Sequence, residues 1–174
     1  MLAGGGAMAT PVERLESRTL LTTFAPTDDA FVRDGSHAAT NYGADVVLQS
    51  KNDAAGYARQ SYLRFDASSF SGAVGSATLR LFGGPAHTNA VVVDLYGVAS
   101  TTWTEAALTW NNKPALNATA LASATVQGTA DGWTEWDVTG YVQQQKAAGN
   151  HVIGFGLKNP NVSVPFVRFN SEVD

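Results

Sequence analysis

Cysteine is absent from the 174 residues of this chain. Its absence excludes disulfides, thiolate metal sites and cysteine nucleophiles, although it does not fix the compartment, because many exported bacterial domains also lack cysteine. No apolar run approaches the roughly 18 residues needed to cross a bilayer, so the sequence predicts no membrane span. Charged residues make up only 15% of the chain, the net charge is −4, and lysine and arginine form no run. We therefore expect no nucleic-acid partner.

Sequence signatures of catalysis are also missing. The chain contains no Gly-x-Ser-x-Gly, no His-Glu-x-x-His and no phosphate-binding loop. Glu105 and Glu135 have the chemistry of a glycosidase pair, but nothing in the sequence brings them together. The three histidines lie far apart without the paired spacing of a transition-metal site. We predict that the chain is not an enzyme and requires no cofactor.

The residues that are present favour one all-β domain. Hydrophobic residues make up 44% of the chain, and 17 glycines accompany abundant threonine, serine, valine and asparagine. Helices between strands, which parallel architecture would need, are absent apart from one weak candidate at Thr139 to Lys146. The predicted fold is an antiparallel, jelly-roll-like β-sandwich of two packed sheets. Its strands are expected at Ala30–Val32, Val46–Lys51, Gln60–Asp66, Ser76–Phe82, Val91–Val98, Trp133–Val138, His151–Leu157 and Val164–Phe169.

The N-terminal segment differs in composition from the rest of the chain. Residues 1–10 are small and glycine-rich, and they cannot bury enough apolar surface to offset the entropy of ordering them. Residues 11–21 resemble a short Leu-Glu-Pro-Arg-x-Leu-Leu-Ser element of exported proteins in one bacterial group, with Ser17 replacing the proline. A disordered leader or short surface helix is the alternative interpretation. We expect residues 1–24 to be this leader or export element, and residues 25–174 to be the β-sandwich module.

Nine short motifs follow one another along the module. They are Asp29-Ala-Phe-Val-Arg-Asp-Gly, Asn41-Tyr42-Gly43, Tyr62-Leu-Arg-Phe-Asp66, Ala77-Thr-Leu-Arg-Leu81, Tyr96-Gly-Val98, Trp103-Thr-Glu105, Leu108-Thr-Trp-Asn-Asn-Lys-Pro114, Trp136-Asp-Val-Thr139 and Phe169-Asn-Ser-Glu172. Their order resembles the DNRLRE domain, which overlaps carbohydrate-binding module family 96. The resemblance runs from about Thr27 to the end of the chain.

The resemblance implies an extracellular jelly-roll module that forms part of a larger, multidomain secreted or surface protein of bacteria. Some members bind an acidic polysaccharide such as alginate, and for many others no ligand is known. Members usually continue past the Phe-x-Ser-Glu motif into a further strand, whereas this chain stops at Asp174. Either the sequence is a fragment that lacks its final strand, or a sheet edge is left open for another chain to cover.

An acidic sugar would need cations held on a rigid face, because guanidinium groups and lysine match carboxylates. Alternation places Arg64 and Arg80 opposite their hydrophobic neighbours, with Tyr62 beside Arg64. If those faces are exposed, the three residues form a basic and aromatic patch that also takes in Lys51 and Arg59. The alternative is that these arginines pair with nearby carboxylates or cover apolar surface. The net charge of −4 also opposes a polyanion.

Two further groups of residues allow competing interpretations. Trp103 and Trp110 have the chemistry of a sugar-stacking platform, but their Thr- and Asn-rich surroundings favour tryptophans that pin a long loop to the sandwich. A structural calcium is the one ion we consider, because it needs six to eight oxygen ligands. Its candidate ligands are Asp28, Asp29 and Asp137.

Two functions follow from these observations. The first is a non-catalytic carbohydrate-binding module that recognises an acidic, alginate-like polysaccharide. The second is a structural or adhesive spacer domain of a surface protein, with no sugar site.

Overall fold

The computed structural model describes residues 21–85, 87–162 and 165–172. The expected leader therefore lies outside the described residues as far as residue 20. Within the described ranges no helix is long and apolar enough to cross a membrane. In chain order the elements are β1 (Asp28–Arg33), a short 3-10 turn (Gly35–His37), β2 (Val47–Ser50), β3 (Arg59–Asp66), β4 (Thr78–Pro85), β5 (Val91–Gly97), β6 (Ala122–Val126), β7 (Gly132–Asp137), α1 (Thr139–Ala147), β8 (Val152–Lys158) and β9 (Val167–Asn170).

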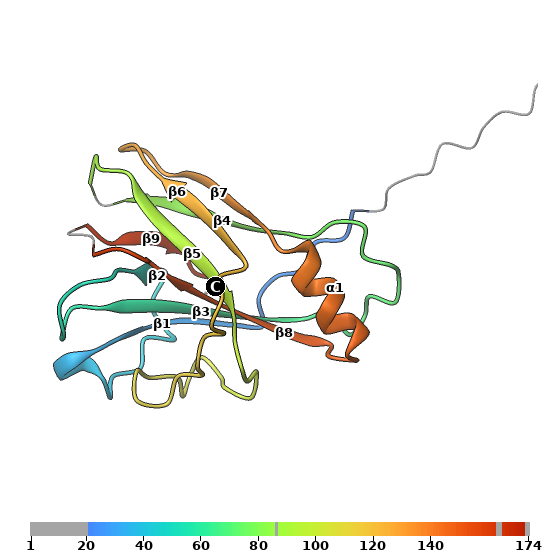
Figure 1. Ribbon diagram of the computed structural model, residues 1–174. Coiled ribbons are helices and arrows are strands. Elements are labelled where there is room, and N and C mark those ends of the chain that lie inside the picture. The colour runs from blue at the N-terminus through green and yellow to red at the C-terminus, as the bar shows by residue number, and fades with distance from the viewer. Residues whose placement is uncertain (1–20, 86, 163–164, 173–174) are drawn as a thin grey trace, which may run out of the picture.

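The strands form two antiparallel sheets, which confirms the predicted all-β sandwich. One sheet has the order β1-β3-β8-β5-β6, and the other has the order β2-β9-β4-β7. Figure 1 shows the sheets as two layers, with α1 lying across one end. The main hydrophobic core lies between the layers and takes residues from both sheets.

Strand β7 illustrates how alternation selects the core. Trp136 is buried, whereas Trp133 and Glu135 on the same strand are exposed, as the period of two predicts. The indole Nε1 of Trp136 donates a hydrogen bond to the carbonyl oxygen of Val93 on the opposite sheet (3.1 Å), and its ring meets Phe169 edge-on. A large aromatic thus joins the two sheets without leaving a buried donor unpaired.

The outer face of the five-stranded sheet is covered by the long connection from Val98 to Leu121. A second hydrophobic cluster lies beneath this connection. Its buried members are Ala30, Val32, Tyr62, Val98, Trp103 and Leu108. Strand β8 carries glycine at positions 154 and 156, where a Cβ atom would overlap the side chains of Val98 and Leu116. The alternate glycines of β8 therefore allow the connection to lie close against the sheet.

Some elements differ from the sequence-based expectation. Strand β6 was not predicted, because its Ala-Ser-Ala-Thr-Val sequence lacks large alternating side chains. Pro165 favoured an edge position for the last strand, or a place as its first residue. Strand β9 instead begins at Val167 and lies between β2 and β4. Proline precedes the ladder here, so it removes no hydrogen bond from it.

Candidate functional site

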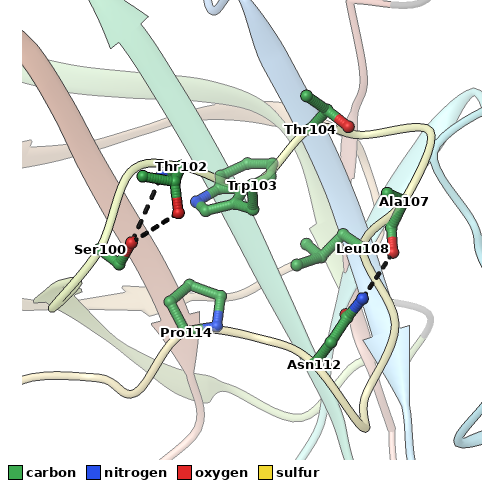
Figure 2. A pocket seen from close by; sticks show the side chains of 8 residues that line it. All are labelled: Ser100, Thr102, Trp103, Thr104, Ala107, Leu108, Asn112 and Pro114. Atoms are coloured by element: carbon green, nitrogen blue, oxygen red, sulfur yellow. Dashed lines mark hydrogen bonds between the residues drawn. The ribbon is translucent and has the colours of Figure 1, made fainter.

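The connection over the five-stranded sheet holds a pocket of about 300 Å³ (Figure 2). Trp103 forms one wall of the pocket, is only 9% exposed, and meets the ring of Tyr62 edge-on at 6.2 Å between centroids. Its Nε1 atom is buried and finds no acceptor among the described residues. The burial supports the interpretation of Trp103 as a pin that holds the connection on the sheet.

Asp28 anchors the same connection from β1. Its carboxylate pairs with the guanidinium of Arg64 on β3, and its Oδ1 accepts a hydrogen bond from the backbone N–H of Glu105 at 3.0 Å. Arg64 also donates to the carbonyl oxygen of Thr101 at 3.2 Å. Arg64 therefore fits the alternative interpretation, in which the arginines pair with nearby carboxylates, because its charge is matched by a buried carboxylate beneath the connection.

The three candidate calcium ligands do not converge. Asp29 is buried and accepts hydrogen bonds from the hydroxyl of Ser171 and the backbone N–H of Glu172. Asp28 likewise meets only donor groups, and Asp137 belongs to β7 in the opposite sheet. In the part of the chain that the structure describes, no group of three His, Cys, Asp or Glu residues could hold a metal ion. The geometry therefore does not fit a calcium site built from this trio.

Tyr62 does not meet the condition of exposure on which its binding role depended. Its side chain is fully buried beneath the connection, and burial raises the pKa of its hydroxyl. That hydroxyl donates to Oε1 of Gln60 (2.9 Å) and lies 3.2 Å from the carbonyl oxygen of Pro114. The condition of an exposed Tyr62 and Arg64 face is therefore not met, because the connection covers the outer side of this sheet, which alternation alone cannot show.

Arg80 is exposed, but it lies on the other sheet from Arg64, so the two do not form one patch. Its Nε lies 3.4 Å from a carboxylate oxygen of Glu135, the residue directly opposite on β7. Its guanidinium also lies over the ring of Trp133, 4.0 Å from the centroid. The aromatic partner of Arg80 is thus Trp133 on the neighbouring strand, which the sequence did not single out.

Lys51 and Arg59 do come together, and the structure adds Arg33 to them. Arg33 lies directly opposite Arg59 across the β1–β3 pair, and Lys51 forms a β-bridge with Arg59. We call these three residues the cationic end site, because they lie where β1 ends, β3 begins and β2 has just ended. The sequence did not single out Arg33, although it belongs to a quoted motif, because strand register could not be read from the residues.

The two arginines of the cationic end site lack anionic partners. Neither guanidinium forms an ion pair within the described ranges, and the Nε atoms of both are buried without an acceptor. Burial, and secondarily the charge of Arg33, lowers the pKa of the Arg59 guanidinium. Lys51 is paired with Asp53, whose charge also acts on Arg59 from beyond ion-pair distance. One carboxylate thus faces three cations, and the excess positive charge of the site resides mainly on Arg33 and Arg59.

Aromatic rings flank the cationic end site. The guanidinium of Arg59 lies over the ring of Phe166 at 4.8 Å, and the ammonium of Lys51 lies 5.9 Å from the ring centroid of Tyr57. The Tyr57 side chain is 57% exposed. The site therefore combines half-buried cations with an exposed aromatic face, which is the combination that an acidic sugar ring needs.

The candidate carboxylate pair for glycoside hydrolysis is separated by the whole sandwich. Glu105 belongs to the connection that covers the five-stranded sheet, where its Oε2 accepts a weak hydrogen bond from the backbone N–H of Asp29 (3.4 Å). Glu135 is exposed on β7 of the opposite sheet. These two carboxylates cannot flank one glycosidic bond.

Comparison with known proteins agrees with the motif order and the fold. A gellan lyase from a Bacillus species is 31% identical over 153 residues, which cover 86% of this chain and 6% of the lyase. The chain thus spans only a small part of the length of this curated relative. The sequence model of carbohydrate-binding module family 96 matches residues 21–173, a range that takes in both sheets and the connection. The chain belongs to carbohydrate-binding module family 96.

Proposed function

We propose that this chain is the non-catalytic polysaccharide-binding module of an extracellular, multidomain bacterial protein, and that it binds an acidic, alginate-like polymer at the cationic end site. Family membership supports a carbohydrate ligand, and the relative's name associates one similar segment with a polysaccharide lyase. The observation that carries the acidic specificity is the juxtaposition of Arg33 and Arg59, neither of which forms an ion pair within the described ranges.

Two guanidinium groups on neighbouring strands favour a ligand carboxylate. Residues that face each other in an antiparallel pair have Cβ atoms about 5 Å apart, so both guanidinium groups of Arg33 and Arg59 can approach one carboxylate. Guanidinium presents donors in a planar fork that matches carboxylate oxygens. Half-burial of both arginines strengthens this attraction, because a lower local dielectric screens charges less than water does.

The aromatic residues provide the non-polar contact that a sugar ring also needs. Tyr57 exposes more than half of its surface and lies on the turn between β2 and β3. Phe166 holds the Arg59 guanidinium in place by stacking, which reduces the entropy lost when a ligand binds. Together these residues form a short site for one or two charged sugar units rather than an extended groove.

Isothermal titration with tetrasaccharides of alginate at low ionic strength tests the proposal. Replacing either arginine with glutamine (Arg33→Gln or Arg59→Gln) removes charge-assisted hydrogen bonds worth about 1.5–3 kcal/mol, so we expect Kd to rise about 10- to 150-fold. Arg80→Gln is the matched control, because Arg80 is exposed and paired on the opposite sheet, and its Kd should stay within about twofold of the unaltered protein.

The result that would overturn the acidic specificity is unchanged affinity in both end-site variants. Retardation of the unaltered protein by no polysaccharide at low salt would instead favour the structural spacer. Catalysis is tested by incubation with alginate, because a non-catalytic module releases neither reducing ends nor unsaturated products.

A further inference from the structure

The outer face of the four-stranded sheet carries a second group of aromatic and charged residues, none of which belongs to the cationic end site. Unlike the outer face of the other sheet, it is not covered by the long connection, and its outward side chains are exposed or partly exposed. We infer that this face is a separate binding surface for an uncharged polysaccharide chain. The face is defined by Arg80 and Phe82 on β4, Trp133 and Glu135 on β7, Arg168 on β9, and Asp131 just before β7.

Trp133 is the centre of the face. Its side chain is 59% exposed, a large fraction for a tryptophan on a regular strand. Phe82, directly opposite on β4, meets the indole edge-on at 5.2 Å, and the guanidinium of Arg80 stacks 4.0 Å from its centroid. These neighbours fix the ring orientation while leaving much of the indole open, so a sugar ring that stacks on it loses little side-chain entropy from the protein.

The polar groups of the face are arranged in matched pairs. Arg80 lies 3.4 Å from Glu135, and Arg168 lies 3.3 Å from Asp131. The four side chains remain between 34% and 56% exposed, so both the donors and the acceptors of each pair can still reach a ligand. Sugar hydroxyls both donate and accept hydrogen bonds, and each pair offers the two functions side by side.

The charge of the face selects against acidic chains. Each of the two arginines is neutralised by its carboxylate partner, and Asp137 on the same side of β7 adds a further negative charge. A polyanion would therefore meet no net attraction here, in contrast to the unmatched Arg33 and Arg59 of the cationic end site. Uncharged sugars are not subject to this repulsion.

The geometry also gives the ligand a direction. Arg168 lies between Gln49 on β2 and Gly84 on β4, and it reaches past Gly84 to Asp131. A Cβ atom at Gly84 would come within 2.9 Å of the Asp131 carboxylate, so glycine allows this pair to form across the strand. Polar groups thus extend over the four strands, about 14 Å at the usual spacing between strands, and an extended sugar chain would lie across them.

A protein partner fits this face less well than a sugar chain. Stable protein interfaces bury a dry, largely apolar centre surrounded by a polar rim. Here the apolar part consists of Trp133 and the half-buried Phe82, while charged pairs occupy the rest of the face. One aromatic ring beside paired polar groups is the composition expected for carbohydrate recognition rather than for a protein interface.

Affinity electrophoresis tests this inference with hydroxyethylcellulose, xyloglucan, soluble laminarin and soluble starch as uncharged probes. We expect at least one of them to retard the unaltered protein, Trp133→Ala to weaken that retardation at least tenfold, and Trp133→Phe to retain part of it. Circular dichroism and the urea midpoint verify that the variants fold, which the exposure of Trp133 favours. Retardation by none of the four polymers, or full retardation of Trp133→Ala, would overturn the inference.

Reciprocal variants separate this inference from the proposed acidic specificity. Trp133→Ala should leave the affinity for alginate tetrasaccharides unchanged, and Arg33→Gln should leave retardation by the uncharged polymer unchanged. If Trp133→Ala weakened binding of both ligand classes equally, the two surfaces would be one site and the inference would be wrong. If only alginate binding failed, the cationic end site alone would be refuted.

Discussion

Replacing Arg33 with glutamine should stabilise the fold while it weakens binding of acidic sugar. Arg33 faces the like charge of Arg59 across the β1–β3 pair, and neither forms an ion pair among the described residues. Like charges directly opposite each other on antiparallel strands are destabilising, by up to about 1 kcal/mol. Arg33→Gln removes this repulsion and keeps part of the side-chain stem. Arg33 is the better choice for the test, because Arg59 would also lose its stacking on Phe166.

The expected gain is about 0.3–1 kcal/mol in the free energy of unfolding at low salt, or roughly 1–4 °C in Tm for a domain of this size. Urea denaturation at about 20 mM and about 0.5 M salt measures it, and the gain should shrink at the higher salt as screening weakens the repulsion. Arg80→Gln is the control, because it breaks an exposed ion pair and should change stability by less than about 1 kcal/mol without a gain. A lower urea midpoint for Arg33→Gln at low salt would refute the proposed repulsion.

Three further predictions concern the connection that covers the five-stranded sheet. Leu108→Ala should lower the free energy of unfolding by about 2–5 kcal/mol in urea titration, because Leu108 is fully buried beneath the connection, whereas the partly exposed Val92→Ala should change it far less. Gly43→Ala should also lower the urea midpoint, since the added Cβ would overlap the carbonyl oxygen of Glu105, and an unchanged midpoint would contradict this close approach. Burial raises the pKa of Tyr62 above its unfolded value, so the unfolded chain releases this proton at a lower pH than the folded chain does. The contribution of Tyr62 to the free energy of unfolding should therefore be fully present below about pH 10 and fall above it. Tyr62→Phe should reduce this alkaline loss of stability in thermal melts recorded as a function of pH.

The strands of the sandwich could largely be predicted because alternation is a local property. The alternation of β7 separates Trp136 from Trp133 and Glu135, and the structure buries the first and exposes the other two. Alternation alone could not show which outer face a loop would cover, and this is why the burial of Tyr62 could not be predicted. Gly43 shows the same limit, since it allows the close approach of the distant loop at Glu105, which no local pattern reveals.

The candidate sites were harder to predict, because they depend on strand register and on sheet membership. Lys51 and Arg59 were chosen for their charge, and they meet because the end of β2 bridges to the start of β3. Arg33, which the sequence did not single out, lies opposite Arg59 across β1 and β3, and the 3-10 turn and β2 separate these two strands in the sequence. Arg64 and Arg80 show similar local patterns but belong to different sheets. Arg64 therefore pairs with Asp28 beneath the connection, whereas Arg80 pairs with Glu135 on an exposed face.

The structure also explains why motif order identifies the family more readily than the ligand. Many motif residues contact one another: Asn41 donates to the carbonyl oxygens of Glu105 and Leu108, and Asp29 accepts hydrogen bonds from the Ser-Glu of the last motif. These contacts hold the connection on the sheet whatever ligand is bound. Lys51, Arg59 and Trp133 lie outside the nine motifs, and of the proposed binding residues Arg33 lies inside the first motif. We therefore expect the residues at these positions to determine which class of sugar the chain binds. Exchanging Trp133 or Arg59 should alter binding while the fold persists.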